Sequence, residues 1–201
     1  VGDGAGRQLI KRPPCTITYA QKLAVVRRAL EAGMAYGDEI APVQAKYLDQ
    51  SQEVVIANSE GIYAHDARVK TRLMITAYAQ DAGGLQTGYV GPGAMQGFEY
   101  YDHLDVESYA REAARMAVTN LHAKRCRGGR MPVVVAGGFG GLLFHEACGH
   151  SLEAEAVAKG RSEFAGKLNQ PIASPVVTLV DDGSLPGQWG SLSVDDEGTS
   201  T

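Results

Sequence analysis

The sequence has no excess of positive charge and no long apolar run, and these two absences remove two classes of partner. Lys and Arg together number 19 against 23 Asp and Glu, which gives a net charge of −4, whereas nucleic-acid binding depends on clustered cations. The longest apolar runs are 133–136 and 176–180, far below the ~20 residues of a membrane span. We therefore expect neither a nucleic-acid partner nor a membrane partner.

Cysteine is scarce as well. Cys15, Cys126 and Cys148 are odd in number and widely spaced, which argues against a disulfide framework. A reducing, cytoplasmic setting is the simplest expectation. The chain opens without Met at Val1 and stops in an acidic, loop-like stretch, 195–201, so we expect it to be part of a longer protein.

The first 125 residues combine helical and strand patterns. Leu23, Val26 and Leu30 fall at helical spacing after Thr18, and Gly33 is a suitable helix stop. Strands are predicted at 52–58, 62–65, 68–80 and 85–90, with a period of two in the third that indicates one buried face. We interpret these strands as a meander. A second helix is predicted from an N-cap at Asp105 to about residue 124, with the apolar stripe Tyr109, Ala113, Met116, Ala117 and Leu121.

The remaining residues predict two buried strands and one long helix. The strands are 132–136, which ends in a glycine-rich stretch, and 175–180. The helix is predicted over 140–158. The fold class is therefore α+β, an antiparallel or mixed sheet with packed helices. We predict an N-terminal domain over 1–125 and, over 126–201, the truncated start of a catalytic domain.

The predicted helix after the glycine-rich stretch carries His145, Glu146 and His150. Neutral imidazole is the commonest metal-ligating side chain, and a hydrolytic zinc site uses about three protein ligands and an open position for water. A nearby carboxylate can take the proton of that water. Two histidines and a glutamate supply most of such a site, whereas His65, His103 and His122 stand alone and are interpreted as surface or structural residues.

The separation of five between the two histidines constrains the backbone. On a regular helix, positions i and i+5 point about 140° apart, so the two rings would diverge. Gly149 precedes His150 and permits the helix to widen. A single π-type turn would bring the rings together, and we predict one here. The apolar run 142–144 indicates that the segment is buried, and a buried His-Glu-His set needs partners or a metal.

At this point the sequence resembles the TldD type of the TldD/PmbA metallopeptidases. The similarity is strongest in the HExxxH segment and the residues after it, and it covers 58–61, 145–155, 160–167, 172–175, 180–183 and 195–199. The resemblance implies that His145 and His150 bind one zinc ion and that Glu146 is the general base. It also implies that the third ligand is a Cys outside this chain.

The same resemblance implies a cytoplasmic peptidase for unfolded or extended peptides, including peptide precursors and antitoxins. It implies a homodimer, or a heterodimer with a TldE/PmbA-like subunit. Two other readings stay open. The chain could belong to a non-catalytic scaffold or regulatory subunit, or to a metal or redox module in which Cys148 joins the two histidines. Trp189 is either a loop anchor or part of a substrate wall.

Overall fold

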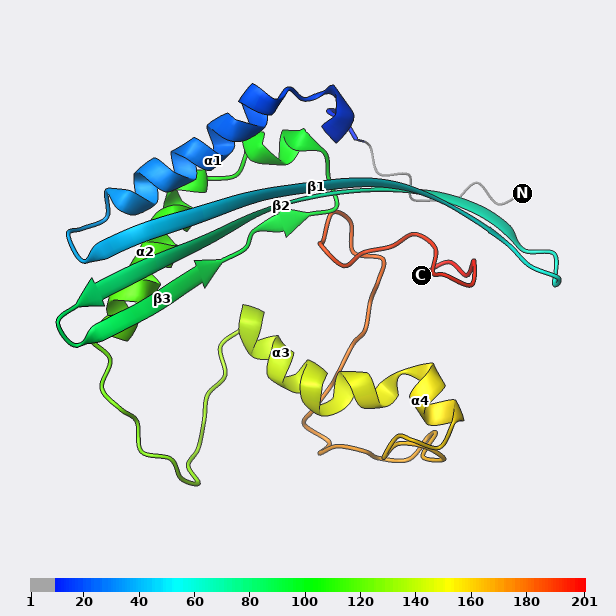
Figure 1. The fold of residues 1–201 in the computed structure, drawn as a ribbon. Coiled ribbons are helices and arrows are strands. Elements are labelled where there is room, and N and C mark those ends of the chain that lie inside the picture. The colour runs from blue at the N-terminus through cyan, green and yellow to red at the C-terminus, as the bar shows by residue number, and fades with distance from the viewer. Residues whose placement is uncertain (1–9) are drawn as a thin grey trace. The chain divides into compact units, whose positions relative to one another are not determined.

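The computed structural model describes residues 10–201, which form two compact units. The first unit comprises the chain up to Arg125 together with Asp182–Thr201, and the second is Cys126–Asp181. Figure 1 shows the elements of both units, and each unit is described by itself. The domain division at residue 125 stays a prediction. No helix within 10–201 is long and apolar enough to cross a membrane.

The first long helix, α1, spans Tyr19–Met34 and follows a short 3-10 turn at Pro14–Thr16. Its start is fixed by a capping box, in which the Thr18 hydroxyl accepts from the Gln21 N–H while the Gln21 side chain accepts from the Thr18 N–H. Gly33 lies inside the helix and is not its stop. A Cβ there would lie 3.1 Å from Val43, so this glycine permits close packing of the helix on the sheet.

The sheet consists of β1 (Ile40–Ala57), β2 (Tyr63–Asp81), β3 (Gly84–Val90) and the short β4 (Gly93–Ala94). All neighbours are antiparallel, in the order β1-β2-β3, with β4 also on β2. The predicted meander is confirmed, but the strands predicted at 62–65 and 68–80 are one strand. The prediction also missed the first two-thirds of β1, residues 40–51, where Pro42 and polar residues hide the strand pattern.

Helix α2, Val106–Leu121, is capped by Asp105, whose carboxylate accepts from the Ser108 N–H at 2.9 Å. It ends three residues before the predicted end. Its buried face carries small residues, and the predicted stripe was wrong at Tyr109, which is exposed. The buried residues are Val106, Ala110, Ala113, Ala114 and Ala117. Because these side chains are short, α2 lies close to β2 and β3 (Figure 1).

One face of the sheet forms the core. In β2 the buried residues alternate as predicted, from Val69 to Ala79. A cluster of aromatic rings extends this core, with Tyr101 packed against Tyr47 and Phe98 at centroid distances of 5.4 and 5.3 Å. The Tyr101 hydroxyl hydrogen-bonds the buried Thr71 hydroxyl at 2.9 Å. Burial raises the pKa of Tyr47 to about 12, so both tyrosines stay neutral at physiological pH.

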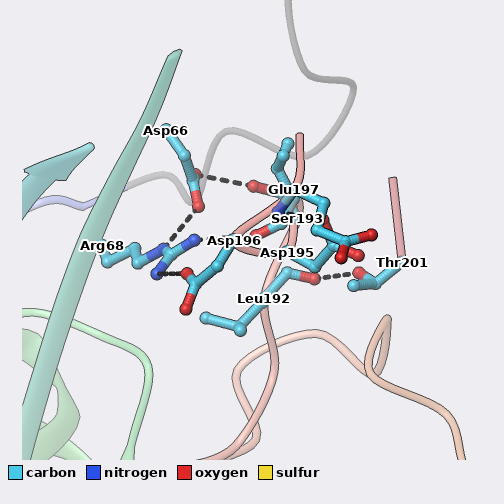
Figure 2. Close-up of polar contacts among 9 residues, drawn as sticks. Asp66, Arg68, Leu192, Ser193, Asp195, Asp196, Glu197 and Thr201 are labelled. Carbon is cyan, nitrogen blue, oxygen red and sulfur yellow. Dashed lines mark hydrogen bonds and ion pairs between the residues drawn. The ribbon is translucent and has the colours of Figure 1, made fainter. Parts of the chain in front are cut away.

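The last residues of the chain pack on the opposite face of β2. Asp66 accepts from Arg68 Nε at 2.8 Å and from the Ser193 hydroxyl at 2.6 Å (Figure 2). Arg68 also donates to the Val194 carbonyl at 2.8 Å. The Trp189 ring lies near Lys70 and Arg72, whose charged groups are 5.3 and 5.0 Å from its centroid. Trp189 is therefore a loop anchor.

The second unit differs from its prediction. It contains α3 (Gly141–Phe144), a π-helix (His145–Gly149), a 3-10 turn (His150–Leu152) and α4 (Ala154–Ala158) in place of one continuous helix. The strands predicted at 132–136 and 175–180 are wrong: neither range is a strand, and Val134 and Val176 are 99% and 90% exposed. A strand requires a hydrogen-bonding neighbour, and no segment of 10–201 pairs with either range.

The close contact between β3 and α2 at Gly88 predicts how a larger residue there would change the stability of the fold. A Cβ at Gly88 would lie 2.0 Å from the Ala113 carbonyl oxygen and 2.6 Å from the Ala117 nitrogen, so Gly88→Ala must push the helix away. We expect it to lower the free energy of unfolding by about 2–3 kcal/mol, measured by urea denaturation. Gly37→Ala is the matched control, because a Cβ there meets nothing within 4 Å; equal losses in the two variants would contradict the packing described.

The anchor at Asp66 predicts a pH dependence. Burial raises the pKa of this carboxyl, but the hydrogen bonds from Arg68 and Ser193 outweigh burial and hold the pKa below its ordinary value. A lowered folded-state pKa stabilises the fold above about pH 4, and this stabilisation is lost as the pH falls through the folded-state value. Asp66→Asn should therefore lower the melting temperature at pH 7, and the difference from the wild type should shrink towards pH 3. A difference independent of pH would show that the charge of Asp66 contributes nothing.

Candidate metal centre

The HExxxH segment is built on a π-helix. Residues His145–Gly149 have π-helical hydrogen bonding, and the His150 N–H bonds back to the His145 carbonyl. A π turn inserts one extra residue relative to an α turn, so positions five apart face the same side. The π-type turn predicted from the spacing of the histidines is therefore present.

The two imidazoles consequently converge. The His145 and His150 ring centroids are 4.5 Å apart, and potential ligand atoms of His145, Glu146 and His150 all lie within 4.8 Å of one another. Two nitrogen ligands on one tetrahedral metal ion lie about 3.3 Å apart, which is within the 4.8 Å limit of this cluster. The donor set of two neutral nitrogens and a carboxylate fits a zinc-type ion.

Gly149 is required by this geometry. A Cβ at position 149 would lie 2.8 Å from His145 Nδ1 and 3.3 Å from its Cγ. Any larger residue would therefore displace the His145 ring. Gly149 thus has two effects: its backbone permits the π turn, and its missing side chain leaves space for an imidazole.

Glu153 contacts the second histidine, and the sequence analysis gave it no role. Its Oε1 lies 2.7 Å from His150 Nδ1. This hydrogen bond is the largest cause that raises the pKa of His150, with the charges of Glu146 and Glu153 adding to it. The available signal was the separation of three, at which helical side chains meet.

The expectation that this segment is buried was wrong. The side chains of Glu146 and His150 are 60% and 55% exposed, and Leu142, Leu143 and Phe144 are exposed as well. Because the segment is exposed, its His and Glu side chains do not need a metal or a hydrogen-bonding partner to offset burial. The convergence of the rings supports a metal site instead.

The other candidate residues lie apart from this group. Cys148 is half-buried, and it does not belong to the ligand cluster found within 10–201. His122 Nε2 lies 2.8 Å from Glu39, and His65 is exposed on β2. His103 lines a pocket of about 700 Å³ in the first unit.

Comparison with known proteins places the chain in a family. The PmbA/TldA metallopeptidase central domain matches residues 12–121, and the PmbA/TldA metallopeptidase C-terminal domain matches residues 128–201. Together these matches cover almost the whole chain. The chain belongs to the PmbA/TldD family of metallopeptidases.

Individual relatives are named as metalloproteases. A metalloprotease TldD homologue of Haemophilus influenzae is 34% identical over 91% of this chain and 39% of its own length. A metalloprotease of Methanothermobacter thermautotrophicus is 34% identical over 98% of this chain and 44% of its own. The chain thus spans about two-fifths of the curated relatives it matches.

Solved structures share the fold at lower identity. A proposed modulator of DNA gyrase from Thermotoga maritima superposes with a TM-score of 0.76 at 22% identity, covering all of this chain and 46% of the other. A similar protein from Bacteroides thetaiotaomicron gives 0.79 at 18% identity, covering all of this chain and 45% of the other. These similarities establish the α+β fold and nothing about activity.

The contact at Gly149 predicts how metal binding can be weakened without removing a ligand. Gly149→Ala should displace the His145 ring and lower zinc affinity about 10- to 100-fold, the range seen when the support of a metal ligand is lost. Competition with a chromophoric chelator measures this affinity in the full-length protein. Gly141→Ala is the control, because its Cβ meets nothing within 4 Å. Unchanged affinity in Gly149→Ala would remove His145 from the site.

Proposed function

We propose that this chain is part of a zinc-dependent peptidase subunit that hydrolyses unfolded or extended peptides, as in peptide-precursor processing and antitoxin degradation. The main support is that potential ligand atoms of His145, Glu146 and His150 lie within 4.8 Å of one another, at the π-helix and the residue that follows it. Metalloprotease names among the relatives support the reaction class. Zinc is the ion of choice because it accepts imidazole ligands in tetrahedral geometry and leaves one position open.

His145 and His150 would hold the ion, and a third protein ligand is expected outside residues 1–201. Hydrolytic zinc sites use three protein ligands, and the family resemblance points to a cysteine thiolate. Two neutral imidazoles bind less tightly than two imidazoles and a thiolate. We therefore expect residues 1–201 alone to hold zinc weakly.

Glu146 is the proton carrier in this proposal. The bound metal would polarise the peptide carbonyl and lower the pKa of a water molecule. The Glu146 carboxylate, 60% exposed, accepts the proton as the water attacks the carbonyl carbon, and then delivers that proton to the leaving amine. Its carboxylate lies within 4.8 Å of potential ligand atoms of both histidines, so it would stand beside the ion without being a necessary ligand.

The proposal extends to location and partners. A cytoplasmic protein fits the scarcity of cysteine. A homodimer, or a heterodimer with a TldE/PmbA-like subunit, is proposed from the family resemblance. The curated relatives are more than twice as long as this chain.

Substitution of Glu146 tests the proposal. In the full-length protein, Glu146→Gln should lower the rate of peptide hydrolysis about 10²- to 10⁴-fold while zinc content stays near that of the wild type. Release of new amino groups from an unfolded protein measures the rate, and elemental analysis measures zinc. Glu163→Gln, an exposed carboxylate elsewhere in the second unit, is the matched control and should retain activity.

The same assay distinguishes a peptidase from a non-catalytic scaffold. A chelator should abolish hydrolysis, and added zinc should restore it. Absence of zinc from the wild type, together with equal behaviour of Glu146→Gln and the control, would favour a non-catalytic or regulatory subunit.

A further inference from the structure

The two nitrogens of His150 face two different carboxylates. Nδ1 lies 2.7 Å from Glu153 Oε1, a hydrogen-bonding distance. Nε2 lies 3.7 Å from Glu146 Oε2, which is too long for a hydrogen bond. One nitrogen is therefore engaged, and the other is open towards the cluster of His145, Glu146 and His150.

This contact determines which nitrogen carries the proton. An ionised carboxylate has no proton to donate, so the nitrogen 2.7 Å from Glu153 must be the donor. In neutral imidazole the other nitrogen then holds the lone pair. The lone pair of His150 is thus on Nε2, the nitrogen on the side of Glu146.

The backbone holds Glu153 at the required place. The 3-10 turn ends at Leu152, and Glu153 adopts an extended conformation with φ −58° and ψ 129°. Its N–H donates to the His150 carbonyl at 3.3 Å, and its carbonyl accepts from the Val157 N–H at 3.1 Å in α4. These bonds fix the backbone on both sides of Glu153, so only side-chain freedom is lost when its carboxylate meets the imidazole.

The neighbouring carboxylates do not compete for this role. Glu155 pairs with Lys159, and Glu146 belongs to the ligand cluster. Glu153 is not a member of that cluster within 10–201, so its geometry suits an orienting residue better than a third ligand. Its side chain makes no capping hydrogen bond to α4, so Glu153→Ala removes no such bond from the start of the helix.

We infer that Glu153 is a positioning residue that holds His150 in the tautomer with the proton on Nδ1 and so presents Nε2 to the metal. The inference rests on the proposed function for the identity of the metal site. Hydrogen bonds from a metal-bound histidine to a carboxylate fix the ring and raise its basicity. The hydrogen bond itself, however, belongs to the chain and exists without a metal.

Two readouts on the full-length protein test this inference. Glu153→Ala should lower zinc affinity about 10- to 100-fold, measured by chelator competition. Glu153→Gln should lose less, because its amide oxygen can still accept from Nδ1–H. In the metal-free protein, nitrogen NMR of His150 should show the Nδ1-protonated tautomer in the wild type and a mixture of tautomers in Glu153→Ala.

Glu163→Ala is the control, because it removes an equal charge from the same unit without touching His150. The inference is overturned if the tautomer of His150 is the same in the wild type and in Glu153→Ala. A loss of zinc with an unchanged tautomer would instead make Glu153 a ligand. If the wild-type protein neither binds zinc nor cleaves peptides, the proposed function fails, while the tautomer measurement still decides the role of Glu153.

Discussion

The candidate metal centre depends on one backbone constraint, the extra residue that a π turn accommodates between His145 and His150. On an α-helix these side chains would point about 140° apart, and no ion could bridge them. With the π turn, the ring centroids are 4.5 Å apart. This convergence also depends on Gly149, because a side chain there would occupy the space of the His145 imidazole.

A spacing of five also changes what surrounds the ligands. In the common zinc-peptidase helix the two histidines are four apart and remain on a regular helix. Here the helix is interrupted after His150 by a 3-10 turn, and this interruption brings Glu153 to the second imidazole. The irregular backbone therefore brings the two histidine rings together and also places Glu153 beside the His150 ring. Departures from α-geometry at functional sites are common for this reason.

The sequence predicted most where local chemistry decides the structure. The cap at Asp105, the helix that follows Thr18, the antiparallel meander and the π turn all follow from short-range spacing, and all are present. The failures lie where a distant partner decides. Residues 132–136 and 175–180 are apolar, but a strand also needs a second strand to pair with, and composition does not show whether one is present. The exposed apolar residues of the second unit were misplaced for the same reason, and Glu153 was missed because its contact depends on a break in the helix.

The return of Asp182–Thr201 to the first unit has a consequence for chain connectivity. Cys126–Asp181 leaves from the end of one folded body and comes back to it, so the metal-binding segment is tethered at two points. The second attachment point is held by hydrogen bonds from Ser193 to Asp66 (Figure 2) and from Arg68 to the Val194 carbonyl. The entropy lost on closing such a loop grows only with the logarithm of its length. Insertions between the two attachment points that lie outside residues 145–153 therefore cost the first body little stability, whereas the spacing within the metal-binding turn is fixed by its geometry.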